Sequence, residues 1–189
     1  NTRVAAAAFL GTLQAGYTDF HYLREVWKTT TEKDSLLGLS MTGIASNKVM
    51  KLDLEEAAQL AVKTNDLMSR EIGIKPAARC TTVKPAGTTS LVLGTSSGIH
   101  AWHNKYYVRR MRVGKNESIY SYLLVNHNEL VEDDYYRPHD TAVISIPQVA
   151  PKGSILRNES PFDLLERVKT FSKSWIRTGH ILGMNTHNV

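Results

Sequence analysis

The chain has 189 residues, of which 42% are hydrophobic, and a formal net charge of +5. This is enough apolar material for one domain, and we expect a single partial domain over residues 1–189. No apolar run approaches the about 18 residues of a membrane span, and no secretion signal opens the chain, so we expect a cytoplasmic protein without a membrane partner. Cys80 is the only cysteine, which excludes an internal disulfide, a paired-cysteine metal site and a substrate-reducing dithiol within this chain.

The positive charge favours an anionic partner, and its one cluster comprises Arg109, Arg110, Arg112 and Lys115. Elsewhere basic and acidic residues are mixed, so a phosphate-bearing small molecule fits this charge as well as nucleic acid does. The sequence begins inside a helical pattern and stops directly after a strand-like stretch. We therefore expect that both ends are cut from a longer protein.

The first third of the chain has the apolar spacing of helices around one strand. We expect a shorter helix over residues 22–28, a buried strand over 36–44, and a long helix that begins at a capping-box-like Asp53 and Glu56. The first helix is predicted from the spacing of Ala6, Phe9, Leu10, Leu13 and Tyr17.

The middle of the chain alternates strand and helix signals. A short strand over 79–83 leads into a Gly/Thr/Ser loop and a helix start. Residues 106–113 are rich in aromatic and β-branched types and predict a strand, 118–126 predict a helix, and 141–146 predict a strand that ends at Pro147.

Near the carboxyl end, Ser160, Pro161 and Asp163 supply the cap, first-turn proline and N3 carboxylate of another helix. We expect its core face to comprise Leu164, Val168, Phe171 and Trp175. Strands alternating with helices indicate an α/β fold with a mainly parallel sheet, or part of a barrel.

The loop after residue 83 has the composition of a phosphate-binding segment. Gly87 lets a backbone approach an anion closely, Thr88, Thr89 and Ser90 offer hydroxyl groups, and Pro85 suits a helix's first turn. Free N–H groups at a helix start favour negative charge. The spacing differs from that of a P-loop, and an ordinary capped helix start remains an alternative.

Several motifs together closely resemble the adenosylcobalamin-dependent ribonucleotide reductases, in that family's order and over nearly the whole chain. They are Leu37-Gly38-Leu39-Ser40-Met41-Thr42-Gly43, Thr82-Val83-Lys84-Pro85-Ala86-Gly87-Thr88-Thr89-Ser90-Leu91, Gly98-Ile99-His100, Tyr106-Tyr107-Val108-Arg109-Arg110, Gly179-His180 and Asn185-Thr186-His187-Asn188-Val189.

The resemblance implies the carboxyl half of a ten-stranded α/β barrel that reduces ribonucleotides to deoxyribonucleotides by thiyl-radical chemistry for DNA synthesis. It implies adenosylcobalamin as cofactor, a ribonucleotide substrate and a dithiol reductant such as thioredoxin. Many members have serine where this chain has Ala86, so one side-chain donor is missing. The substrate phosphates would be bound by Pro85, Ala86, Gly87, Thr88, Thr89 and Ser90.

The family's Asn-Pro-Cys-Gly-Glu motif and its redox cysteine pair do not occur in this sequence. We therefore expect no catalytic residue in this fragment and no activity of the fragment alone. Half a barrel would also expose apolar surface, so we expect self-association or marginal stability.

Other residues are better explained by structural roles. Cys80 lies in a predicted strand and is expected in the core. His100 with His103, and the later His180 and His187, lack carboxylate-rich spacing, so no metal site is predicted. Trp102 can pack against a ligand.

Three alternatives stay open at this point. One is a non-catalytic nucleotide- or phosphate-binding module, and another is the large subunit of a related reductase class that uses a separate iron-containing subunit. The third is a nucleic-acid-binding protein that uses residues 109–115, ranked last because its basic residues form no long stripe with aromatics.

Overall fold

The computed structural model describes residues 1–178. The motifs predicted at 179–180 and 185–189, and with them His180 and His187, lie outside the described residues. In chain order the elements are α1 (Thr2–Ala15), α2 (Glu25–Asp34), α3 (Leu54–Glu71), α4 (Gly87–Val92), β1 (Tyr106–Gly114), α5 (Ser118–Asn126), the 3-10 turn η1 (Asn128–Leu130), β2 (Val131–Asp133), β3 (Thr141–Val149), α6 (Pro161–Phe171) and the π-helical turn η2 (Ser172–Arg177).

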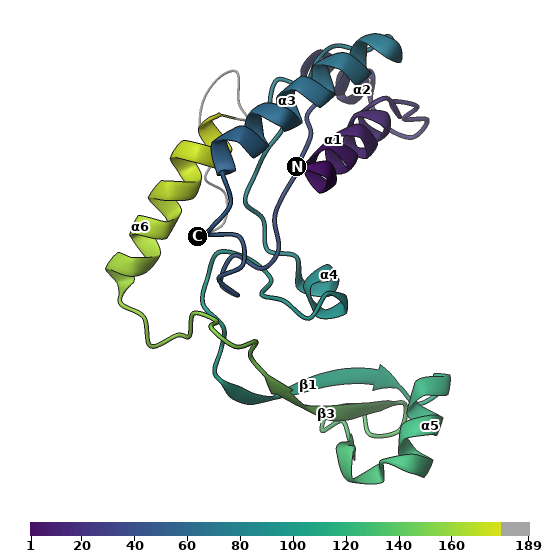
Figure 1. Cartoon of the computed structure of the whole chain (residues 1–189). Coiled ribbons are helices and arrows are strands. Elements are labelled where there is room, and N and C mark those ends of the chain that lie inside the picture. The colour runs from purple at the N-terminus through teal and green to yellow at the C-terminus, as the bar shows by residue number, and fades with distance from the viewer. Residues whose placement is uncertain (179–189) are drawn as a thin grey trace.

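The helices and the sheet occupy opposite ends of the molecule. Figure 1 shows α1, α2 and α3 at one end, β1, β3 and α5 at the other, and α4 in between, while α6 runs along one side. Within the described part of the chain, every helix is too short or too polar to span a bilayer.

The core at the helical end is built on small residues where α1 packs against α3. Ala8, Ala58 and Ala61 are fully buried, and side chains of this size let two helices approach closely. The long helix begins at the predicted cap, where the Asp53 side chain accepts a hydrogen bond from the backbone N–H of Glu56. Helix α1 itself is confirmed, but its predicted face is wrong. Ala6, Phe9, Leu10 and Tyr17 are exposed and Leu13 is half-buried, while Ala8 and Thr12 are the buried residues of α1.

One buried polar network joins α1, α3 and the segment that follows α3. The Asn65 amide donates to Thr12 Oγ1 at 2.9 Å, and its carbonyl oxygen accepts from the backbone N–H of Ala77 at 2.8 Å. Thr12 in turn donates to the carbonyl of Ala8 at 2.7 Å. Every member of this buried network has a partner, which a dry core requires.

The two strands predicted at 36–44 and 79–83 form only a short parallel pairing. Leu39 bridges Thr81 in parallel, with backbone bonds from Leu37 N–H to Arg79 O at 3.0 Å and from Thr82 N–H to Leu39 O at 2.8 Å. Both segments end with the residues that continue into the candidate site.

The regular sheet is antiparallel, so the expectation of a mainly parallel sheet was wrong for it. Its strand order is β1-β3-β2, and β1 pairs with β3 from Tyr106↔Val149 to Gly114↔Thr141. A helix between two strands implies a parallel crossover only when it covers the sheet. Here α5 buries no residue, so the connection is a long hairpin excursion.

β3 also runs beyond its predicted end. It continues through Pro147 to Val149, opposite Val108 of β1. On its other side β2 pairs only as far as Ile144. Pro147 therefore lies where β3 has a free edge, and there a residue without an N–H is tolerated.

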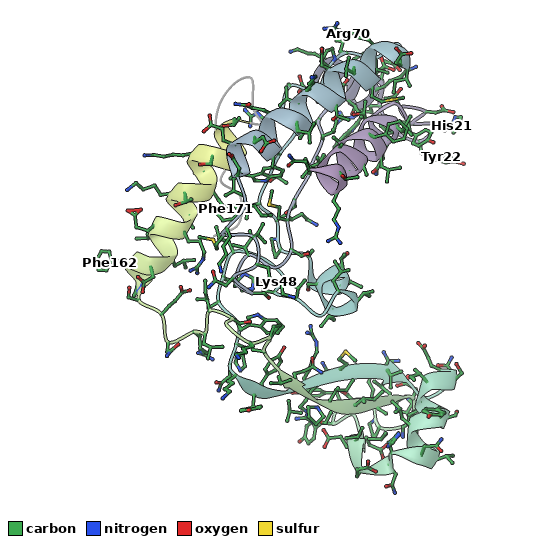
Figure 2. The ribbon with its side chains drawn as sticks, viewed as in Figure 1. His21, Tyr22, Lys48, Arg70, Phe162 and Phe171 are labelled. Carbon is green, nitrogen blue, oxygen red and sulfur yellow. The ribbon has the colours of Figure 1, made fainter. Side chains whose placement is uncertain are left out.

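The carboxyl-terminal helix begins and packs as predicted. Ser160 and Asp163 form a capping box with Pro161 in the first turn, and Phe171 and Trp175 are fully buried. Figure 2 shows Phe171 on the core side of α6 and Phe162 at its outer end. Trp175 Nε1 donates to Thr82 O at 2.9 Å and Thr81 Oγ1 to Trp175 O at 2.8 Å, which ties this end of the chain to the parallel pairing.

We expect Asn65→Ala to lower the free energy of unfolding by about 2–4 kcal/mol, because it removes two buried hydrogen bonds and leaves the Ala77 N–H unpaired. Chemical denaturation measures the loss. Gln59→Ala removes an exposed amide from the same helix and serves as the matched control. Equal stability of the two variants would contradict the role given to Asn65.

Candidate functional site

The predicted phosphate loop leads directly from the parallel pairing into α4. Its first part is held in place, because Lys84 N–H donates to Ser40 Oγ at 2.9 Å and Ser40 Oγ donates back to Lys84 O at 3.1 Å. Ala86 N–H donates to Ser97 O at 2.8 Å. The backbone of the loop is therefore fixed before the helix begins.

The start of α4 leaves donors open. Gly87, Thr88 and Thr89 are exposed, and as the first residues of a helix their N–H groups have no carbonyl one turn earlier. The N-cap is Ala86, which has no side chain able to accept from them. Ser90 is buried, and its hydroxyl donates to Gly87 O at 3.3 Å. The open donors are thus concentrated at residues 87–89, while those of Ala86 and Ser90 are engaged within the protein.

A cavity of about 480 Å³ separates α4 from β1. This size falls within the range of small-molecule sites. The cavity brings together parts of features that the sequence could only suggest separately: Gly87 and Ser90 of the loop, His100, Trp102, and two arginines of the basic cluster. The other predicted phosphate-binding residues, Pro85, Ala86, Thr88 and Thr89, do not line it. Its lining comprises Gly87, Ser90, Leu91, Thr95, Ser96, Ser97, His100, Ala101, Trp102, His103, Tyr107, Val108, Arg109 and Arg110.

The floor of the cavity is held by a serine that the sequence analysis missed. Ser46 Oγ accepts from Ser96 N–H at 2.9 Å, from Trp102 Nε1 at 3.3 Å and from Thr95 Oγ1 at 3.2 Å. Ser46 N–H donates to Ser96 Oγ at 3.1 Å. One buried hydroxyl therefore joins the segment after α4 to the Trp102 ring, and no local pattern marks it.

Arg167 of α6 holds the backbone next to His100, and the sequence analysis missed this residue too. It is 5% exposed and pairs with Glu159 through two bonds of 2.7 and 2.8 Å. Its Nε donates to Ile99 O at 2.9 Å. A buried arginine needs such partners for its charge, and here the geometry fixes the backbone next to His100.

The histidines and aromatic rings of the cavity contact one another and the loops around them. His100 Nε2 lies 3.1 Å from Ser97 Oγ, and His103 Nδ1 lies 3.3 Å from Arg157 Nη1. The Tyr107 ring centroid lies 6.3 Å from that of Trp102 and 5.7 Å from that of His103. Within residues 1–178, no cluster of three metal-ligating side chains occurs.

The basic cluster is mostly neutralised by carboxylates of β2 and the residue after it. Arg110 forms an ion pair with Glu132. Arg112 Nε lies 2.6 Å from Asp134 Oδ2, and Lys115 Nζ lies 2.6 Å from Asp133 Oδ1. Arg109 is half-buried and has no hydrogen-bond or ion-pair partner among the described residues. The strand therefore carries one uncompensated guanidinium at the cavity.

Asp134 anchors this network. Its side chain is buried, and the hydrogen bond from Arg112, helped by the N–H groups of Tyr136 and Arg137, holds the pKa of this carboxyl below its ordinary value. Cys80, in contrast, lies in the core at 1% exposure, as predicted. Burial raises the pKa of its thiol to about 11, so it stays protonated and unreactive at neutral pH.

A second cavity of about 480 Å³ lies between α1 and the residues that follow the parallel pairing. Arg3 and Lys48 lie at its margin, and Val4, Leu39 and Trp175 give it apolar walls. Both cations are exposed to solvent, so they carry no uncompensated buried charge.

Comparison with known proteins gives relatives of one kind. The chain is 28% identical over 151 residues to an adenosylcobalamin-dependent ribonucleoside-triphosphate reductase of Euglena gracilis, covering 75% of this chain and 20% of the relative. It is 26% identical over 160 residues to a probable enzyme of that name from Dictyostelium discoideum, covering 77% and 20%. The relative from Lactobacillus acidophilus is 28% identical over 123 residues, covering 49% and 16%. No protein-family model matches the chain.

A solved B12-dependent, class II ribonucleotide reductase matches the structure with a TM-score of 0.67 at 19% identity, covering 80% of this chain and 26% of that chain. This match shows the fold. The resemblance drawn from the motifs is confirmed by these relatives, and the chain spans about one fifth of the length of the curated relatives from Euglena and Dictyostelium.

We expect Asp134→Asn to lower the melting temperature at pH 7 by several degrees, because the amide cannot carry the charge that Arg112 pairs with. A carboxyl with a lowered pKa stabilises the fold above its ordinary value of 3.8, and this stability is lost as the pH falls through the lower folded value. The gap between variant and wild type should therefore narrow in acid. Thermal melts from pH 7 to pH 3 measure it, with exposed Asp133→Asn as control. A gap independent of pH would contradict this.

Proposed function

We propose that this chain is part of the catalytic subunit of an adenosylcobalamin-dependent ribonucleotide reductase, and that it seats the phosphates of the ribonucleotide substrate. The observation that carries the proposal is the cavity between α4 and β1, which is lined by Gly87 at the start of α4 and by the uncompensated Arg109. The open N–H groups of Thr88 and Thr89 follow Gly87 directly in the chain. The complete enzyme would convert ribonucleotides to deoxyribonucleotides by thiyl-radical chemistry and so supply DNA synthesis.

The phosphate seat would use backbone donors more than side chains. Gly87 has nothing within 4 Å of the position that a Cβ would take, so an anion can approach its backbone. Thr88 and Thr89 add exposed hydroxyls, and the bonds at Lys84 and Ala86 keep the turn from collapsing. Donors fixed in advance bind an anion without an ordering cost.

Catalysis would depend on parts of the enzyme beyond this chain. The one cysteine, Cys80, is buried with a raised pKa, so the radical thiol and the reducing thiols must come from elsewhere, and the chain alone should be inactive. The relatives are named adenosylcobalamin-dependent and triphosphate reductases, and by that likeness we propose the same cofactor and a triphosphate substrate for the parent. When bound, the cofactor supplies the radical.

The cofactor is inferred from the names of the relatives alone. We therefore assign no residue of this chain to the cofactor and derive no step through it. The ten-stranded barrel, the single partial domain, a dithiol reductant such as thioredoxin and a cytoplasmic location are proposed for the complete enzyme on the same family likeness.

The alternatives differ in what supports them. The cobalamin type is favoured over the iron-subunit type because the reported relatives are cobalamin enzymes. Nucleic-acid binding through 109–115 loses support because three of its four cations are paired with acidic residues. A non-catalytic phosphate-binding module would use the same loop. The sequence of the native gene on both sides of this segment distinguishes it from a reductase.

We expect the native gene to encode an in-frame Asn-Pro-Cys-Gly-Glu upstream of Asn1 and a cysteine-bearing tail downstream of Val189. The reason is that the described thiol cannot perform the reduction. Sequencing both flanks tests this. Start and stop codons at these two positions would instead support the non-catalytic module.

We expect Gly87→Ala to weaken binding of pyrophosphate to the chain by roughly tenfold or more, because a methyl group would obstruct the anion's approach to the backbone N–H groups that donate hydrogen bonds to it. The methyl meets no protein atom, so the fold should be unchanged. Isothermal titration measures affinity and thermal melting checks the fold. Thr29→Ala on distant α2 is the control. Unchanged affinity in Gly87→Ala would contradict the proposed seat.

A further inference from the structure

We propose that Arg109 binds the outermost phosphate of a nucleoside triphosphate across the cavity from α4 and so determines the preference for triphosphates over diphosphates. The inference rests on the proposed phosphate seat and adds the opposite wall of the cavity to it. It gives a role to the one cation of the basic cluster that the fold leaves without a partner.

Arg109 is a partly buried cation without a partner among the described residues. Its side chain is half-buried in β1 and lines the cavity, yet no described residue offers it a hydrogen bond or a carboxylate. A guanidinium presents five donors and keeps its charge at any physiological pH. Partial burial without a partner costs solvation, and an anion in the cavity would recover it.

The neighbouring arginines of β1, in contrast, are paired with carboxylates. Side chains alternate along a strand, and Arg110 and Arg112 fall together on the side of the β2 carboxylates, where Glu132 and Asp134 neutralise them. Arg110 also reaches the cavity margin, but its charge is engaged. Arg109 is therefore the member of the cluster that is free to meet a ligand.

The lining of the cavity favours an anion. Its fourteen lining residues include Arg109 and Arg110 of β1 but no aspartate or glutamate. At the start of α4, Gly87 lines the cavity with a neutral N–H group, and the exposed Thr88 and Thr89 follow it with N–H and hydroxyl groups. The cavity thus has one wall that can hydrogen-bond phosphate oxygens and one that can neutralise charge.

These two walls fit a chain of phosphates better than a single one. Phosphates held at Gly87, Thr88 and Thr89 would be the inner groups of the substrate, and a diphosphate would end there. One further phosphate extends into the cavity and carries the additional negative charge. A bidentate guanidinium matches such a terminal group in shape and charge.

The test titrates the 189-residue chain with sodium tripolyphosphate and with pyrophosphate, at low ionic strength, by isothermal titration calorimetry. For wild type we expect tripolyphosphate to bind roughly tenfold more tightly, as a charge-assisted hydrogen bond implies. Arg109→Gln should bring that ratio close to one and change pyrophosphate affinity little. Arg109→Lys, which keeps the charge, should retain part of the ratio and guards against a folding defect.

Arg70→Gln is the control for net charge, because Arg70 lies at the far end of α3 (Figure 2), where it pairs with Asp66 away from the cavity. If it lowers the ratio as much as Arg109→Gln does, net charge sets the preference and the proposal is overturned. If Arg109→Gln leaves the ratio intact, Arg109 has no such role although the phosphate seat stands. If wild type binds neither probe, the seat itself fails and this inference fails with it.

Discussion

The position of the predicted phosphate loop depends on the short parallel pairing between residues 37–39 and 79–82. Buried polar bonds hold the pairing from two sides: Asn65 fixes Ala77 just before it, and Trp175 bonds Thr81 and Thr82. The two segments stay side by side beyond the pairing, because Ser40 exchanges two hydrogen bonds with the backbone of Lys84 where the loop begins. A loop that follows directly from such a clamp presents its N–H groups in one geometry, which anion binding needs.

The cavity beside that loop depends on a second buried group. Ser46 bonds the segment after α4 and the Trp102 indole at once, and Arg167 holds the backbone before His100. Figure 1 shows α4 between the helical end and β1. Ser46 and Arg167 hold residues 95–102, the segment that leads from α4 toward β1. Their contribution is positional, because neither lines the cavity.

Most of the positive charge on and next to β1 is neutralised by ion pairs. Glu132 and Asp134 neutralise Arg110 and Arg112 on one face of β1, and Asp133 pairs with Lys115 just after the strand. The uncompensated Arg109 remains on the cavity side. The proposed phosphate seat uses backbone donors and this guanidinium, so it does not depend on the buried thiol of Cys80.

Local signals in the sequence were sufficient for the helix starts at Asp53 and Ser160, for β1 and α5, and for the loop with its motifs, because capping and periodicity act within a few residues. The burial of Cys80 followed from its residue type. Tertiary structure decided the antiparallel order of the sheet, the exposure of Leu10, and the assembly of the cavity. Each of those depends on contacts between residues tens of positions apart, such as Ser46 with Trp102 or Arg112 with Asp134, and no pattern along the chain encodes which distant partner a side chain meets.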